Sequence, residues 1–222
     1  MKYLLAAAAT TLLIAGSAVA HDGDEVDRNV VADYDFSGFD SIDVSGVYKL
    51  DVRAGDQFSV RTEATEDSAE WLEVKLKGDT LILGKKKTRK SHDWKGEHHD
   101  HGVHVIVTMP RLVDLDVSGV ATGEISAFTG GRINIDIGGV SDLTLSGTCS
   151  RLDIDMGGVG KVDAEALKCD HVDADMGGVG KLSVYAAKSI NADSSGMSKI
   201  DVYGNPSDTN VESSRMAKVN IH

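Results

Sequence analysis

A short internal repeat in the second half of the chain is the feature that most constrains its fold. A small turn, often Gly-Gly-Val, recurs at steps of 20, 19, 20, 18 and 19 residues, with its last residue at Val120, Val140, Val159, Val179, Met197 and Met216. A repeat this short cannot bury a hydrophobic face alone, so it is stable only when successive copies stack. The repeat therefore predicts a solenoid of stacked coils.

Each copy has the pattern of extended chain. The segment from Leu152 to Met156 alternates apolar and acidic residues before the turn, and a second alternating segment follows the turn, as in Lys181 to Val184. A period of two is typical of a half-buried strand, and no segment of the repeat has helical period. We therefore expect an all-β fold, a single-stranded parallel β-helix with coils of about 19 residues.

Stacking in register predicts vertical columns of inward side chains. Two such columns precede the turn and are apolar: Val113, Ile133, Leu152, Val172 and Ile190, then Leu115, Ile135, Ile154, Ala174, Ala192 and Val211. A third predicted inward column is the set of turn-ending residues from Val120 to Met216. The glycine before each of these is expected to adopt a positive φ, which other residues resist. Arg215 interrupts that rule in the last copy.

The first half of the chain repeats less regularly. Residues 1–20 combine Lys2, an apolar run too short to cross a bilayer and a small-residue end at Ala20, which predicts a signal peptide and export to the periplasm or the cell surface. Residues 21–35 are expected to be a flexible segment, since His21 to Asn29 are polar. A β-helix domain over 36–222 should begin with irregular coils, a hairpin at Lys77-Gly78-Asp79 and a basic, His-rich insertion at 85–102.

The overall charge restricts the partners. With 35 acidic and 23 basic residues, the formal net charge is −12. This balance argues against nucleic acid or an anionic membrane as a partner and favours cations or basic surfaces. No later apolar run suggests a transmembrane segment.

Two outward columns of polar residues are the strongest chemical feature. One contains Asp114, Asn134, Asp153, Asp173, Asn191 and Asn210, and the other contains Asp116, Asp136, Asp155, Asp175, Asp193 and Glu212. Stacked carboxylates repel one another, and a lysine six residues after four acids of the second column suggests pairing across the turn. Where Asp142 replaces that lysine, a calcium site is the alternative, formed by Asp114, Asp116, Asp136 and Asp142.

The insertion contains a second candidate metal site. His98, His99, His101 and His104 lie within seven residues, and neutral imidazole is a common ligand of zinc and copper. Their spacing matches no standard closed site, and tracts of this kind also occur as solvated loops. Both interpretations stay open on the sequence alone.

The two cysteines occupy equivalent places in adjacent repeats. Cys149 and Cys169 are 20 residues apart, so stacked coils would bring them within disulfide distance. Export permits oxidation. The sequence predicts a structural disulfide, with two buried free thiols as the alternative.

Several short motifs occur in a characteristic order: Phe39-Asp-Ser-Ile42 before a Ser-Gly turn, Met109-Pro110 before the segment Leu112 to Leu115, serial glycine-rich turns, and Tyr203-Gly204-Asn-Pro206. In these motifs the chain resembles the head GIN domain family of auto-transporter adhesins. The resemblance covers about residues 36–221 and implies a right-handed parallel β-helix.

These features together predict an exported, non-catalytic module that recognises a surface, a glycan or a cation. The alternatives are a periplasmic zinc- or copper-binding protein, and a structural protein that self-associates through coil ends near Asn220. The turns are short, which argues against the long-looped cleft of a polysaccharide-cleaving enzyme, because activity needs a site and not only a fold.

Overall fold

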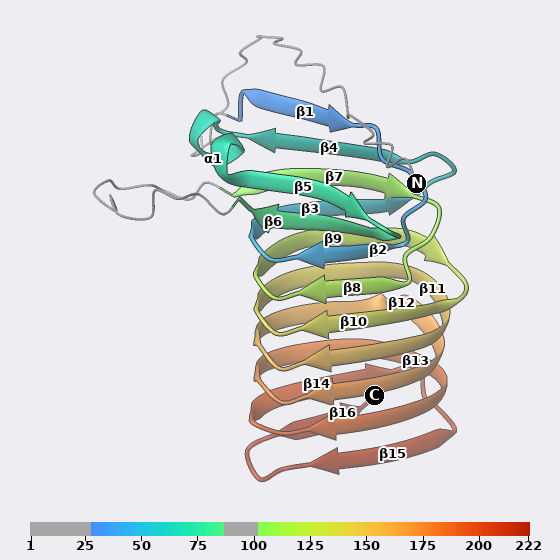
Figure 1. Cartoon of the computed structure of the whole chain (residues 1–222). Helices are drawn as coiled ribbons and strands as arrows, with labels where there is room; N and C mark the ends of the chain where they lie inside the picture. Colours follow the sequence, from blue (N-terminus) through green and yellow to red (C-terminus); the bar gives the residue numbers. More distant parts are fainter. Residues whose placement is uncertain (1–27, 87–101) are drawn as a thin grey trace, which may run out of the picture.

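A computed structural model of the chain describes residues 28–86 and 102–222 and confirms the predicted solenoid (Figure 1). The stacked coils are formed by β8 (Asp114–Val117), β9 (Val120–Thr129), β10 (Arg132–Ile137), β11 (Val140–Met156), β12 (Val159–Met176), β13 (Val179–Ser194), β14 (Met197–Tyr203), β15 (Asp208–Ser213) and β16 (Lys218–Ile221). They pair in parallel throughout.

The long strands join two walls of the solenoid. The first part of β11 pairs with β9 and its second part pairs with β10, so one continuous strand contributes to both walls. β12 and β13 continue the same arrangement. This bending produces one closed coil about every 19 residues, as the sequence period requires.

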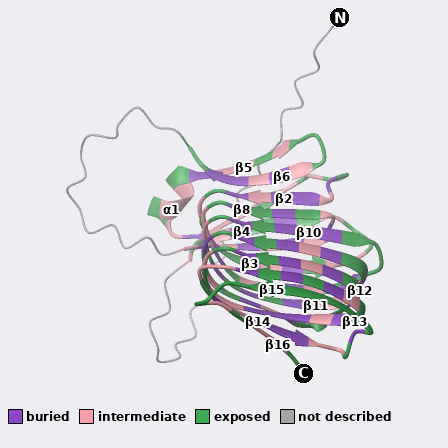
Figure 2. Ribbon diagram, turned by 90° about the horizontal axis from the view of Figure 1, so that it is seen from below, coloured by how far each residue is buried: buried purple, intermediate pink, exposed green. Residues whose placement is uncertain are grey.

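The predicted register is correct for the columns before the turn. Ile135 lies opposite Leu115 on one side and Ile154 on the other, and Ile154 lies opposite Ala174. These side chains are buried inside the stack (Figure 2). At the margins the columns are less covered: Val113 is only half-buried, and Val211 is exposed in the last coil.

The third predicted column was wrong, because its residues point outward. Val159 begins the strand after the corner on the outer side, so the alternation places Gly160 and Val162 on the inner side. Val162 stacks with Leu143, Leu182 and Ile200, all fully buried, and these residues form the actual inward column.

The glycines before these residues have a different role from the one predicted. Gly196 alone among them has a positive φ, of 72°. The others are required by close approach between coils: a Cβ at Gly158 would lie 1.9 Å from the carbonyl oxygen of Gly139. Only a residue without a Cβ fits that contact.

The N-terminal part covers the first coil with antiparallel strands. Its elements are β1 (Val30–Tyr34), β2 (Ser41–Val44), β3 (Val47–Ala54), β4 (Ser59–Ala64), α1 (Glu66–Trp71), β5 (Leu72–Lys77), β6 (Thr80–Lys85) and β7 (Val103–Met109). β4 pairs antiparallel with β7 and β1, while β2 and β3 already join the parallel stack. The β5–β6 hairpin turns at Gly78, with φ 65°, as predicted.

Two features of this region differ from the sequence analysis. β1 lies inside residues 21–35, which were expected to be flexible; its pairing with β4 orders the segment because it covers an otherwise open sheet edge. The six-residue helix α1 was not predicted; Thr65 caps it by accepting a hydrogen bond from the Ser68 N–H at 3.2 Å. No helix of the described ranges 28–86 and 102–222 is long and apolar enough to cross a membrane.

The predicted disulfide is confirmed. Cys149 in β11 and Cys169 in β12 lie opposite each other in register, with their Cα atoms 4.5 Å apart, and the bond joins them. It closes one coil of the stack covalently.

Removing this bond should destabilise the protein without changing its fold. We expect the double variant Cys149→Ala/Cys169→Ala to lose about 2 to 4 kcal/mol of unfolding free energy, because the unfolded chain regains the freedom of the closed loop. Urea unfolding followed by circular dichroism measures the loss. An unchanged midpoint would contradict a structural role, and reduction of the wild type should reproduce the variant.

Candidate functional site: an acidic groove along the coils

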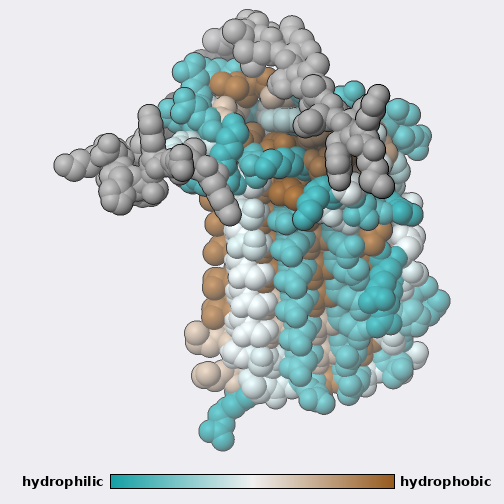
Figure 3. All heavy atoms as spheres, viewed as in Figure 1, coloured by the Kyte–Doolittle hydropathy of each residue, from teal (hydrophilic) through white to brown (hydrophobic). Residues whose placement is uncertain are grey.

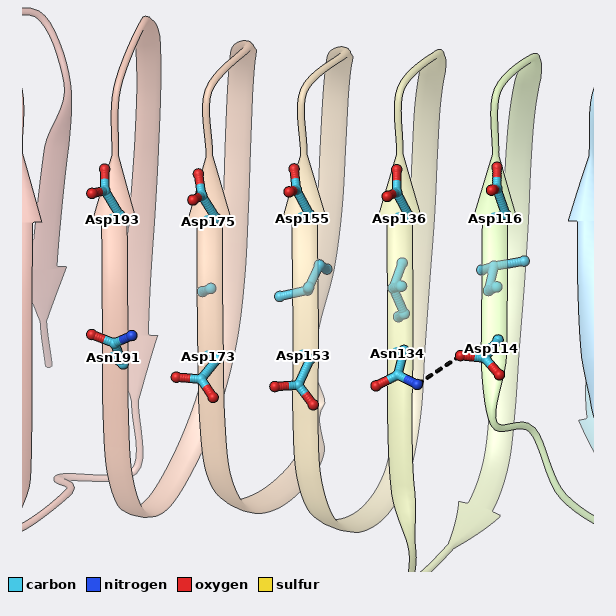
Figure 4. A pocket seen from close by; sticks show the side chains of 14 residues that line it. Asp114, Asp116, Asn134, Asp136, Asp153, Asp155, Asp173, Asp175, Asn191 and Asp193 are labelled. Carbon is cyan, nitrogen blue, oxygen red and sulfur yellow. Dashed lines mark hydrogen bonds between the residues drawn. The ribbon is translucent and has the colours of Figure 1, made fainter.

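The two outward polar columns enclose a shallow groove on the wall formed by β8, β10, β11, β12 and β13. Figure 4 shows both columns projecting from the same face, one on either side of the strand centres. The groove has a volume of about 520 Å³. Its floor is the sheet itself, beneath which Leu115, Ile135, Ile154 and Ala174 point into the core. The strict register of the coils therefore repeats one carboxylate arrangement along the stack.

The column that includes Asp114, Asn134, Asp153, Asp173 and Asn191, here named the mixed ladder, is internally neutralised. Arg151 pairs with Asp153 at 3.1 Å and also contacts Asp173, and Arg132 lies 2.7 Å from Asp153. The amide of Asn134 donates to Asp114 at 2.6 Å (Figure 4). Sequence analysis missed both arginines, although each stands two residues before its ladder position and so projects from the same side of its strand.

The other column, the aspartate ladder, has no such partners. It contains Asp116, Asp136, Asp155, Asp175 and Asp193, and it continues to Asp43 and Glu212 in the flanking coils. Within residues 28–86 and 102–222, no lysine, arginine or histidine nitrogen lies within 4.0 Å of its carboxylates. Adjacent coils are about 4.8 Å apart, so neighbouring carboxylates of the ladder repel one another.

The pKa values of Asp116 and Asp155 reflect that repulsion together with burial. Burial raises the pKa of Asp116, and the neighbouring Asp43 and Asp136 raise it further. The pKa of Asp155 is likewise raised by burial and then by Asp175 and Asp136. A cation placed in the groove would relieve this repulsion, because an opposite charge favours the ionised carboxylates.

The comparisons with known proteins agree with this architecture. Residues 38–206 match the family described as "Putative auto-transporter adhesin, head GIN domain". The chain belongs to this family. The match spans more than half of the chain and confirms the resemblance found in the sequence motifs.

Solved structures resemble this head GIN domain as well. A putative adhesin from Bacteroides fragilis superposes with a TM-score of 0.68 at 21% identity, covering 86% of this chain and 96% of that chain. A second putative adhesin, from Parabacteroides distasonis, covers 86% of this chain and 96% of its own at 16% identity, with a TM-score of 0.48. At 21% identity, the likeness to the Bacteroides fragilis structure establishes the fold alone. Comparison with curated proteins gave no match.

The predicted calcium set is not brought together in this GIN domain. Asp114, Asp116 and Asp136 line the groove, but Asp142 follows the corner and lies on the other wall. There it borders a separate hollow of about 490 Å³ with Lys49, His104 and Glu124 among its lining residues. In the described part of the chain, no three histidine, cysteine or acidic side chains are grouped closely enough to hold a metal ion.

Of the four histidines of the predicted zinc or copper site, only His104 belongs to the described part of the chain. His98, His99 and His101 lie outside the described residues, as does the signal peptide. His104 lies in β7, where its Nδ1 is 3.3 Å from the Glu63 carboxylate.

The lysines expected to pair with the aspartate ladder do not reach it. Lys161 pairs with Asp163 at 3.6 Å, and Lys181 and Lys199 pair with Asp201. Each lysine follows the corner, so it projects from the second wall and contacts acids there. The corner thus separates the aspartate ladder from the cations that the sequence pattern had assigned to it.

Proposed function

We propose that this protein is an exported, non-catalytic binding module of the adhesin type, and that its acidic groove binds an extended cationic ligand. The observation that carries the proposal is the contrast between the two ladders. The mixed ladder has its own arginines, whereas no basic residue of the described ranges 28–86 and 102–222 pairs with the aspartate ladder.

The form of the groove supports an extended ligand. The five labelled coils of Figure 4 present the same pair of polar side chains at each level, a run of about 19 Å at the spacing of paired strands. A polymer with amines or guanidinium groups at regular intervals would meet a carboxylate at each level. The same repetition supports a non-catalytic role, because each coil offers similar groups and no single level combines different chemical functions.

Export of the module is supported by the signal-peptide pattern of residues 1–20 and by the disulfide. The adhesin-type role is supported by the family. A binding protein outside the cell meets cationic polymers and divalent ions on surfaces, and an acidic face attracts both.

Binding of hexalysine should report on the groove. We expect isothermal titration to show association at low ionic strength, weakening as salt increases. In the triple variant Asp136→Asn/Asp155→Asn/Asp175→Asn the affinity should fall at least tenfold, because three neighbouring charges of the aspartate ladder are lost. Calcium should compete with the peptide, since it neutralises the same carboxylates.

A matched control separates the groove from net charge. The variant Asp56→Asn/Asp142→Asn/Glu165→Gln removes three exposed acids that lie outside the groove lining. It should bind hexalysine within twofold of the wild type. Equal losses in the two triple variants would show that only overall charge matters, and the proposed site would then be wrong.

A further inference from the structure

The corner between the two walls carries a continuous stripe of exposed apolar side chains, here named the apolar ladder. Its exposed fractions are 48% at Val140, 51% at Val159, 41% at Val179, 60% at Met197 and 72% at Met216. The first four are in register in successive coils. Figure 3 shows the stripe along the left edge of the coils. Single exposed apolar residues are common, but a contiguous stripe marks an interaction surface.

The apolar ladder is bordered by opposite charges on its two sides. In the coil of Val159, Asp155 precedes the corner and Lys161 follows it. The next two coils repeat the order acid, apolar, base: Asp175, Val179 and Lys181, then Asp193, Met197 and Lys199. Because each set is in register, the edge presents an acidic column, an apolar column and a basic column side by side.

We infer that this edge binds a second copy of the chain, with the two solenoids side by side and parallel. A two-fold axis parallel to the solenoid axis brings the apolar ladders together and places the aspartate ladder of each copy opposite the lysines of the other. The antiparallel arrangement would place acid opposite acid and base opposite base. Charge complementarity therefore selects both the partner and its direction.

The extent of the edge limits the strength of this contact. Two features interrupt the edge toward its N-terminal end. Helix α1 projects beyond the edge there (Figure 1). The coil of Val140 has Asp142 at the position where the next coil has Lys161. The apolar ladder covers five coils, or about 19 Å along the solenoid axis. The six residue steps from the acidic to the basic column, as from Asp155 to Lys161, span at most about 20 Å, so the edge measures roughly 400 Å² per copy. The total of roughly 800 Å² is below the range of stable specific interfaces, so the dimer should be weak and depend on protein concentration.

Cysteine cross-linking tests the contact and its direction. Val140→Cys, Val159→Cys and Val179→Cys, made separately in the full chain, each place a thiol beside its own counterpart in the parallel dimer. We expect all three to form disulfide-linked dimers under mild oxidation. Ala187→Cys, exposed in β13 at another corner, is the control and should stay monomeric. Cross-linking at only one position, or at none above the control, would overturn the inference.

Charge reversal in the Val159→Cys variant tests the charge complementarity between the two copies. Asp155→Lys makes both borders basic and Lys161→Glu makes both acidic, so each variant alone should cross-link at least tenfold more slowly. An equal mixture of the two should recover the rate as a heterodimer. No recovery would overturn the charge argument. The inference does not need the groove ligand, although the partner's lysines and hexalysine would face the same aspartate ladder. Lys161→Glu should therefore impair the dimer and bind hexalysine at least as tightly as the wild type, so the two proposals can fail separately.

Discussion

Replacement of Gly158 by alanine should destabilise the protein by more than about 4 kcal/mol, which is the exceptional end of single-substitution effects. The added Cβ would lie 1.9 Å from the carbonyl oxygen of Gly139 and 2.9 Å from its carbonyl carbon. Both atoms belong to backbone, so no side chain can move aside. The same oxygen accepts a hydrogen bond from the Val159 N–H at 2.9 Å, and separating the coils to relieve the clash would break that bond.

The adjacent glycine provides a matched control. A Cβ at Gly157 meets no atom within 4 Å, and its φ is outside the left-handed region. Gly157→Ala should therefore be neutral or stabilise by about 0.5 kcal/mol through the entropy of the unfolded chain. Urea unfolding of the two variants, followed by circular dichroism, measures the difference. Similar midpoints would contradict close coil contact at Gly158.

Much of the fold was readable from the repeat because each copy meets the same environment. Ile135 and Ile154 occupy equivalent positions in adjacent coils, so aligning the repeats in the sequence also predicted which residues lie opposite each other. The N-terminal part has no such regularity. The pairing of β1 with β4 depends on contacts between residues 26 or more apart, which no local pattern specifies, as Asp33 and Arg61 illustrate.

The errors at the corner have one physical origin. Alternation fixes which residues of a strand share a face, but a turn between two strands resets which face is inward. Val159 was assigned to the core for its apolarity, and Lys161 was assigned to Asp155 for its charge. The structure places Val159 in solvent and Lys161 near Asp163, since both follow the corner on the outer side.

The site was predictable in its composition and less so in its electrostatics. The two outward columns follow from period two and the repeat length. Whether their charges are compensated depends on side-chain reach across coils, as with Arg151 contacting Asp173 in the next coil. Sequence spacing alone does not determine such contacts, so the difference between the two ladders emerged only from the structure.

Asp201→Asn should cost about 3 kcal/mol at neutral pH, because it removes a buried carboxylate that accepts several charge-assisted hydrogen bonds. The Asp201 side chain is 2% exposed and accepts from Lys199 at 2.7 Å, while Lys181 lies 3.1 Å away. Asn220 and His222 contact its other oxygen, at 2.7 and 3.2 Å, so this acid joins β14 to the last coil. Asp163, in the same outward column, pairs with Lys161 at 3.6 Å and accepts from the Glu165 N–H at 3.4 Å, and Asp163→Asn should cost under about 1 kcal/mol.

The pH dependence identifies the cause of that loss. Burial raises the pKa of Asp201, but the hydrogen bonds from Lys199, Asn220, His222 and Lys181 outweigh it and hold the pKa well below the usual value of 3.8. The native state therefore binds this proton less tightly than the unfolded chain, and the stabilisation is present above about pH 4 and is lost as the pH falls further. Urea unfolding at pH 7, 5 and 3 should show a constant gap between wild type and Asp201→Asn at the two higher values and a smaller gap at pH 3. A gap that does not narrow would mean that the variant acts by packing and not by charge.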